Sequence, residues 1–168
     1  MNNITLIGMS GCGKTVVGKR LTQILNMEFF DADAEIEREQ GMLISEIFEK
    51  SGEAEFRRLE REKIAELAKL TNAVISTGGG VVLNPENMAN LKQNSVVVFL
   101  GRSVDDILST LDNSNRPLLK DISKVQKLYD ERINLYRKYA DVVVENVGTI
   151  EEVAEKMAYK WQMKEELQ

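Results

Sequence analysis

The sequence predicts a three-layer α/β/α domain built on a five-stranded parallel sheet. Short β-branched runs alternate with longer segments of helical period, which is the pattern of a parallel sheet covered by helices. The runs are Ile4–Ile7, Glu28–Phe30, Ala73–Ser76, Val96–Leu100 and Val142–Val144. Four of the five are continuous apolar stretches, as expected for strands that are buried on both faces. The order of the strands within the sheet does not follow from this pattern.

Apolar residues at helical spacing predict three of the covering helices. Two segments gather apolar side chains on one face: Lys14–Leu25 with Val17, Leu21, Ile24 and Leu25, and Glu53–Leu70 with Phe56, Leu59, Ile64 and Leu67. Thr149 and Glu152 form a capping-box pattern, which begins a last helix. The apolar positions of that helix are Val153, Met157 and Trp161.

The composition limits the classes of function. With 168 residues, the chain is long enough for one domain, residues 1–168, with a sizeable core. Its net charge of −5 gives no general basic field for nucleic acid or an anionic membrane. The absence of histidine excludes imidazole bases, and a single cysteine excludes an internal disulfide and suits a reducing compartment. With no basic leader, no apolar run of roughly 20 residues and no apolar surface helix, we expect a cytoplasmic monomer.

A phosphate-binding P-loop pattern follows the first predicted strand: Gly8-Met9-Ser10-Gly11-Cys12-Gly13-Lys14-Thr15. Glycines let successive backbone N–H groups point inward at an anion, and the following helix adds its positive N-terminal end. Lys14 brings a mobile charge to the β- and γ-phosphates, and the Thr15 hydroxyl can ligate Mg²⁺. Cys12 fills a variable position, where an exposed thiol could be alkylated or oxidised. The motif and its context predict NTP binding.

The P-loop does not define the acceptor of the phosphoryl group. The Asn-Lys-x-Asp guanine motif of GTPases is absent, and no apolar strand ends in a Walker-B aspartate. The residue that helps Thr15 to hold magnesium must therefore come from elsewhere. Asp31 and Asp33 follow the second strand, at the edge where such sheets bind ligands. One could order magnesium through water and the other could take a proton from an acceptor hydroxyl; helix caps or solvated turn residues are the alternative.

Three successive glycines follow the third strand, in Thr77-Gly78-Gly79-Gly80. Such a run loses much conformational entropy on folding, so some structural or functional requirement must favour residues without side chains here. Either a small ligand approaches the N–H groups, or the chain makes a tight crossover turn.

Three arginines complete the set of candidate residues. Arg57 precedes Glu60 by about one helical turn, so the carboxylate can hold the guanidinium in place. Arg116 lies in a polar, asparagine-rich loop, and Arg132 lies one turn before Tyr136 on the following helix. Any one of these arginines is more often a surface ion-pair residue than a ligand contact, so their value lies in the combination.

In combination, the motifs resemble the shikimate kinase family over essentially the whole chain. The matching stretches are Gly11-Cys12-Gly13-Lys14-Thr15, Asp31-Ala32-Asp33, Gly52-Glu53-Ala54-Glu55-Phe56-Arg57, Thr77-Gly78-Gly79-Gly80, Arg116-Pro117-Leu118-Leu119 and Arg132 with Leu135-Tyr136. The resemblance implies a P-loop kinase with sheet order 2-3-1-4-5. It also implies that Mg·ATP phosphorylates the 3-hydroxyl of shikimate, giving ADP and shikimate 3-phosphate, a step of aromatic amino acid biosynthesis.

The resemblance also implies roles for individual residues. Asp33 would bind the shikimate hydroxyls and serve as the base. The shikimate carboxylate would be held by Arg57 and Arg132, and the ring hydroxyls would meet the backbone of Gly78, Gly79 and Gly80. The substrate-binding region would span about residues 31–62.

On the nucleotide side, the resemblance implies contacts from Gly11, Cys12, Gly13, Lys14, Thr15, Val16 and Arg116. Thr15 and Asp31 would position Mg²⁺, and Arg116 would lie on a lid, about residues 109–122, that closes over the transferring phosphate. Since phosphoryl transfer depends mostly on positioning and charge stabilisation, Lys14 and Arg116 should matter more to the chemical step than proton removal by Asp33.

One position departs from the family pattern. Members commonly carry an arginine seven positions before the lid arginine, and this chain has Ser109 there. We therefore predict weaker ATP affinity or a looser preference for the nucleotide base.

Alternative functions are another small-molecule kinase of the same fold, such as a gluconate kinase, or a non-catalytic nucleotide-binding regulator. A nucleic-acid-processing ATPase is disfavoured by the acidic charge and the lack of a second domain.

Overall fold

The computed structural model describes residues 2–110 and 122–167. The strands are β1 (Asn3–Ile7), β2 (Glu28–Asp31), β3 (Ala73–Ser76), β4 (Ser95–Gly101) and β5 (Val142–Glu145). The helices are α1 (Lys14–Leu25), α2 (Ala32–Gln40), α3 (Ile44–Leu67), the 3₁₀ turn η1 (Val81–Leu83), α4 (Pro85–Lys92), α5 (Val104–Ser109), α6 (Ile122–Tyr139) and α7 (Ile150–Glu166). Each predicted strand lies within one residue of an observed one.

The five strands form one parallel sheet in the order β2-β3-β1-β4-β5. This order confirms the one implied by the family resemblance. β1 is central: Thr5 is in register with Ile75 of β3 on one side and with Val97 of β4 on the other. The β1, β3 and β4 strands are buried throughout, and their β-branched side chains form the middle of the core.

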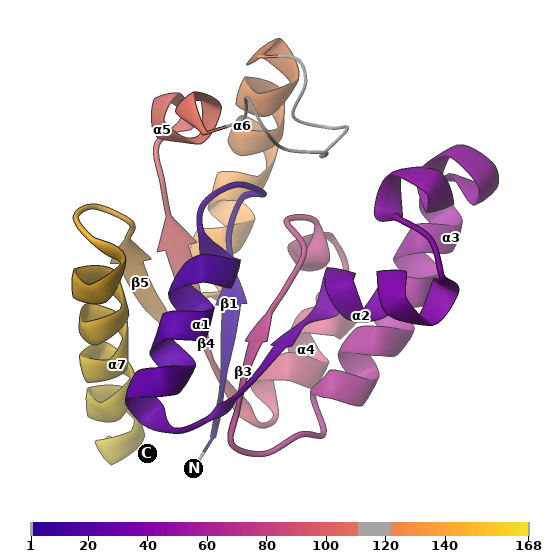
Figure 1. The fold of residues 1–168 in the computed structure, drawn as a ribbon. Helices are drawn as coiled ribbons and strands as arrows, with labels where there is room; N and C mark the ends of the chain where they lie inside the picture. The colour runs from indigo at the N-terminus through magenta and orange to yellow at the C-terminus, as the bar shows by residue number, and fades with distance from the viewer. Residues whose placement is uncertain (1, 111–121, 168) are drawn as a thin grey trace.

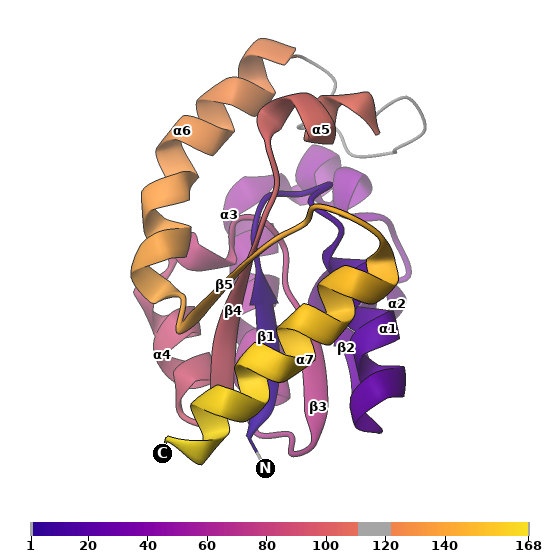
Figure 2. The ribbon, with the colours of Figure 1, turned by 90° about the vertical axis from the view of Figure 1, so that its left-hand side faces the viewer.

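Helices cover both faces of the sheet. α1 and α7 pack side by side on one face, and α3, α4 and α6 cover the other (Figures 1 and 2). The predicted capping box begins α7. Thr149 Oγ1 accepts a hydrogen bond from the Glu152 N–H at 3.1 Å, and Glu152 Oε2 accepts one from the Thr149 N–H at 2.8 Å. Val153, Met157 and Trp161 are buried, as their spacing predicts.

Three local predictions need correction. β5 is an edge strand, so Val143 is 40% exposed although its run is apolar. Ile24 is 36% exposed, because it lies at the margin of the buried face of α1. The predicted Glu53–Leu70 helix ends at Leu67 and is the second part of α3, which begins at Ile44 and breaks at Gly52 (φ 82°, ψ 169°). A further helix, α2, follows β2 directly; no pattern predicted it, but Asp31 caps it, as one of the alternatives for this residue allowed.

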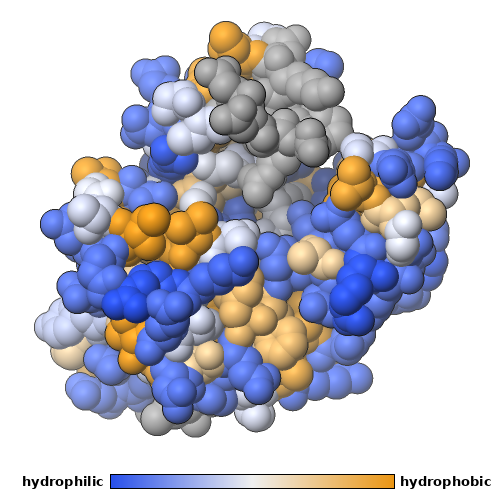
Figure 3. Space-filling view, in the orientation of Figure 1, coloured by the Kyte–Doolittle hydropathy of each residue, from blue (hydrophilic) through white to orange (hydrophobic). Residues whose placement is uncertain are grey.

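The carboxyl ends of all five strands meet at one edge of the sheet, uppermost in Figure 1. The surface in that view is mainly hydrophilic, with hydrophobic residues gathered over α1 and the start of α7 (Figure 3). No helix in the described part of the chain has the length and apolar character to cross a membrane. The P-loop and the loops after β2, β3 and β4 therefore share one rim, where the candidate residues meet.

Candidate active site

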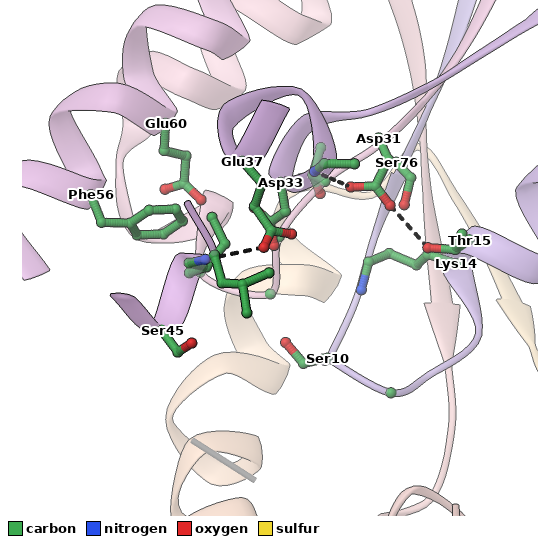
Figure 4. Close-up of a pocket in the computed structure, with 18 of the residues that line it drawn as sticks. Ser10, Lys14, Thr15, Asp31, Asp33, Glu37, Ser45, Phe56, Glu60 and Ser76 are labelled. Carbon is green, nitrogen blue, oxygen red and sulfur yellow. Dashed lines mark hydrogen bonds between the residues drawn. The ribbon is translucent and has the colours of Figure 1, made fainter. Parts of the chain in front are cut away.

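A cavity of about 730 Å³ opens at this rim. It is lined by the P-loop, the start of α2, both parts of α3, the glycine turn after β3 and Arg132 of α6. Figure 4 shows Lys14, Thr15 and Asp31 on one side and Phe56 and Glu60 on the other, with Asp33 between them. One cavity thus holds the phosphate-binding motif and the candidate acceptor residues, which come from distant parts of the sequence.

The P-loop curves around a left-handed glycine. Gly13 has φ 100° and immediately precedes α1, and a Cβ at this position would lie 2.6 Å from Asn146 Nδ2. Only glycine fits both the backbone angle and the space. The buried Lys14 ammonium donates to the carbonyl oxygens of Gly8 (2.7 Å) and Met9 (3.0 Å), so it is held at the mouth of the loop. Cys12 is 1% exposed, so the exposed thiol considered from sequence is absent.

Thr15 and Asp31 are joined across the P-loop and the end of β2. The Thr15 hydroxyl donates to Asp31 Oδ2 at 3.0 Å, while Asp31 Oδ1 accepts from the Ala34 N–H at 3.1 Å and caps α2 (Figure 4). The magnesium interpretation and the helix-cap interpretation of Asp31 are therefore compatible. An oxygen pair beside a phosphate loop suits Mg²⁺, which takes one or two protein oxygens and completes its shell with phosphate and water.

Each glycine of the turn after β3 makes room for a polar side chain of the site. A Cβ on Gly78 would lie 2.8 Å from Asp33 Oδ1, and one on Gly80 would overlap the Arg57 guanidinium, 2.7 Å from its Cζ. A Cβ on Gly79 would lie 3.0 Å from Ser10 Oγ and 3.3 Å from Arg132 Nη1. The three positions are therefore glycine because side chains of other elements approach the backbone closely. Neither sequence interpretation named this reason.

Arg57 and Arg132 meet around the buried Glu60 carboxylate. Arg57 Nη1 donates to Glu60 Oε1 at 3.0 Å, as the helical spacing predicts, and Glu53 lies 3.4 Å from Nη2. Arg132 is only 6% exposed. Burial raises the pKa of Glu60, while the positive charges of Arg57 and Arg132 oppose that shift.

Three buried polar atoms of this group have no hydrogen-bond partner within residues 2–110 and 122–167: Arg57 Nε, Arg132 Nε and Glu60 Oε2. A buried donor without a partner is costly. Arg57 and Arg132 therefore bring two guanidinium groups to the wall of the cavity, and groups of this kind suit a carboxylate, which they bind in bidentate fashion.

Several residues near the site had no assigned role from sequence. Arg102 lines the cavity and donates to the Gly11 carbonyl at 2.9 Å, and Asn146 donates to the Cys12 carbonyl at 2.7 Å. Both follow strand ends, but single polar residues there give no periodic pattern. Val16 lines the cavity, and its contact with the nucleotide stays a prediction; Arg116 and most of the proposed lid lie outside the described residues.

The fold and the cavity define a P-loop kinase. The family model for shikimate kinase matches residues 10–162. The chain is 44% identical over 157 residues to a shikimate kinase of Clostridium botulinum. The aligned residues cover 93% of this chain and 94% of the relative. The chain belongs to the shikimate kinase family, whose members are ATP-dependent kinases acting on a shikimate hydroxyl.

Solved structures agree with this placement. The shikimate kinase of Acinetobacter baumannii, solved in complex with shikimate, superposes with a TM-score of 0.93 at 38% identity, covering 100% of this chain and 96% of that chain. A gluconokinase of Sinorhizobium meliloti superposes with a TM-score of 0.57 at 16% identity, over 97% of both chains. The second likeness shows a shared fold alone.

Proposed function

We propose that this chain transfers the γ-phosphoryl group of ATP to the 3-hydroxyl of shikimate, giving ADP and shikimate 3-phosphate. The observation that carries the proposal is the pair of guanidinium groups, Arg57 and Arg132, packed against a bare glycine turn in the cavity of the P-loop. Shikimate is a small monoanion with three hydroxyls, so its site needs a carboxylate clamp and close polar contacts. A gluconate kinase would share the P-loop, but its acceptor need not call for this clamp.

On the acceptor side, Arg57 and Arg132 bind the carboxylate of shikimate. Asp33, at the start of α2, binds the ring hydroxyls and takes the proton of the reacting one. Its carboxylate fits against Gly78, so the acceptor hydroxyl can lie beside the backbone of the glycine turn. The apolar wall of Phe48 and Phe56 covers the carbocyclic ring. These contacts extend over the proposed substrate-binding region, about residues 31–62, and beyond it to the turn and α6.

On the nucleotide side, the phosphates are surrounded by Gly11, Cys12, Gly13, Lys14, Thr15 and Val16, whose loop offers backbone N–H groups, while the Cys12 N–H itself donates to the Met9 carbonyl at 3.1 Å. The Lys14 ammonium follows the charge of the transferring group. Mg²⁺, when bound by Thr15 and through water by Asp31, neutralises charge on the β- and γ-phosphates. We place Arg116 on a lid, about residues 109–122, where it stabilises the transferring phosphoryl group. Excluding water matters because hydrolysis of ATP competes with transfer.

The test is a coupled assay of ADP release from Mg·ATP with shikimate, with gluconate and with no acceptor. We expect release that saturates with shikimate and remains at the no-acceptor rate with gluconate. Release that is equal with all three additions, from folded protein that binds ATP, would contradict the proposal.

A further inference from the structure

Tyr136 lies directly behind the glycine turn and outside the cavity. It is fully buried, and its hydroxyl donates to the Gly79 carbonyl oxygen at 2.6 Å. Its ring stacks on Phe99 of β4, with centroids 5.2 Å apart and planes 23° from parallel. The hydroxyl is therefore fixed by the core on one side and by α6 on the other, and it meets the site at the Gly79 carbonyl, with the Arg132 side chain beside it.

The hydrogen bond determines which way a neighbouring peptide faces. In a trans peptide the C=O and the following N–H point in opposite directions, and the described residues contain no cis peptide bond. The Gly78 carbonyl accepts from the Val81 N–H at 3.2 Å, and the Gly79 carbonyl accepts from Tyr136. The N–H groups of Gly79 and Gly80 must therefore point away from these donors, on the side where both residues line the cavity.

These two N–H groups have no hydrogen-bond acceptor within the described parts of the chain. Since buried or half-buried N–H groups are nearly always paired, a pair held open at a cavity wall is suited to a ligand oxygen. Burial raises the pKa of the Tyr136 phenol, against the opposing charge of Arg132, so the hydroxyl remains a donor throughout the working pH range.

The same helix supplies a second contact to this turn. Arg132 lies one helical turn before Tyr136, and its Nη1 approaches the open side of Gly79. α6 thus presents a cation beside the turn and a hydroxyl behind it, which fixes the turn and the carboxylate clamp relative to each other.

We propose that Tyr136 is a positioning residue for the acceptor: by holding the Gly79 carbonyl, it directs the Gly79 and Gly80 N–H groups at the hydroxyls of shikimate. This inference rests on the proposed function for the identity of the acceptor. Tyr136 touches neither substrate: it acts on the Gly79 peptide group, and its hydroxyl also lies beside Arg132 of the carboxylate clamp.

The test compares Tyr136→Phe with Tyr139→Phe, which removes a hydroxyl from the same helix one turn later, where the ring is only partly buried. We expect Tyr136→Phe to raise the KM for shikimate roughly five- to tenfold, because a buried carbonyl loses its donor, with the KM for ATP unchanged. Tyr139→Phe should change neither constant. The proposal would be overturned by an unchanged KM for shikimate in Tyr136→Phe. It would also be overturned if the KM values for shikimate and ATP rose equally in that variant, or if the KM for shikimate rose equally in Tyr136→Phe and Tyr139→Phe.

An NMR measurement separates this inference from the proposed function. In ¹⁵N-labelled protein, Tyr136→Phe should move the amide resonances of Gly79 and Gly80, whereas Tyr139→Phe should not, whichever acceptor the enzyme uses. In the wild type, shikimate should shift the same two resonances and leave exposed Gly41 in place. The positioning role would be overturned if the Gly79 and Gly80 resonances did not move in Tyr136→Phe. If that variant does not fold, the same conclusion would follow when these resonances did not move in the titration of the wild type with shikimate. A wild type without shikimate-dependent turnover would instead overturn the proposed function.

Discussion

The nucleotide end and the acceptor end of the cavity are built in different ways. The P-loop is one continuous segment between β1 and α1, and its own Lys14 bonds back to the Gly8 and Met9 carbonyls. The acceptor end combines side chains of α2, α3 and α6 with the turn after β3. A local motif can form a phosphate site by itself, whereas the acceptor site exists only when four separate elements are packed together.

This difference changes how substitutions should behave. On the nucleotide side, we expect each residue to act through its own contact with the phosphates. On the acceptor side, Arg57 occupies space that Gly80 leaves open, and Asp33 does the same at Gly78. Substitutions there should therefore interact with each other, because residues that share a contact are not energetically independent.

The largest effect should come from Lys14→Met, which removes the mobile charge of the P-loop. We expect kcat to fall by roughly 10²–10³-fold, as when one preorganised donor to a developing charge is lost. The shikimate affinity, measured by titration without ATP, should be nearly unchanged. A large loss of shikimate affinity would show that the two ends of the cavity are not separable.

Arg57→Ala should mainly weaken shikimate binding. We expect the KM for shikimate to rise by roughly 100-fold, because one partner of a buried charge pair is removed and Glu60 is left without it. The matched control is Arg58→Ala, since Arg58 is exposed and pairs with Glu55 and Glu62 on the outer face of α3. Equal kinetics of the two variants would exclude the carboxylate clamp.

Gly80→Ala should displace the Arg57 guanidinium. A Cβ at this position would overlap that group, so we expect the shikimate KM to rise by about tenfold, with little change for ATP. In the double variant with Arg57→Ala, the added methyl group should cost almost nothing more. Additive effects in this cycle would mean that the glycine has a different purpose.

Glu60→Gln should alter the pH dependence of stability. Because burial raises its folded pKa above the ordinary 4.5, the folded protein holds this proton more tightly than the unfolded chain. The stabilisation from the protonated form is complete below that ordinary value and is lost as pH rises through the folded pKa. Arg57 and Arg132 reduce the shift, and Glu53 adds to it.

Chemical unfolding at several pH values measures this effect. The wild type should lose stability relative to Glu60→Gln as pH rises through that window. Glu62→Gln, on the exposed side of the same helix, should show no such trend. If the free energy of unfolding of the wild type instead rose relative to that of Glu60→Gln with rising pH, the assigned sign would be wrong.

The smallest effect is expected at Ser109, on the nucleotide side. Its hydroxyl donates to the Asp106 carbonyl at 2.7 Å, and the side chain is exposed at the end of α5. Ser109→Arg should lower the KM for ATP about two- to fivefold, since an exposed cation contributes little. Equal ATP affinity in the variant and the wild type would count against a role for the missing arginine.

The sequence alone determined the parts that depend on neighbours along the chain. The positions of the strands, the P-loop and the Thr149–Glu152 capping box follow from periodicity and spacing, and the structure confirms them. The pairing of Arg57 with Glu60 also follows from the helical repeat. The strand order was accessible only through the family resemblance, because the strand pattern is the same for many orders.

Only the tertiary structure decided what each side chain meets across the cavity. It explains the three glycines by the groups packed against them, gives Asp31 two partners at once and places Tyr136 behind the Gly79 carbonyl. It also exposes Val143 at the sheet edge despite an apolar run. The physical reason is that these contacts depend on sheet order and helix packing, which bring distant residues together without leaving a periodic trace in the sequence.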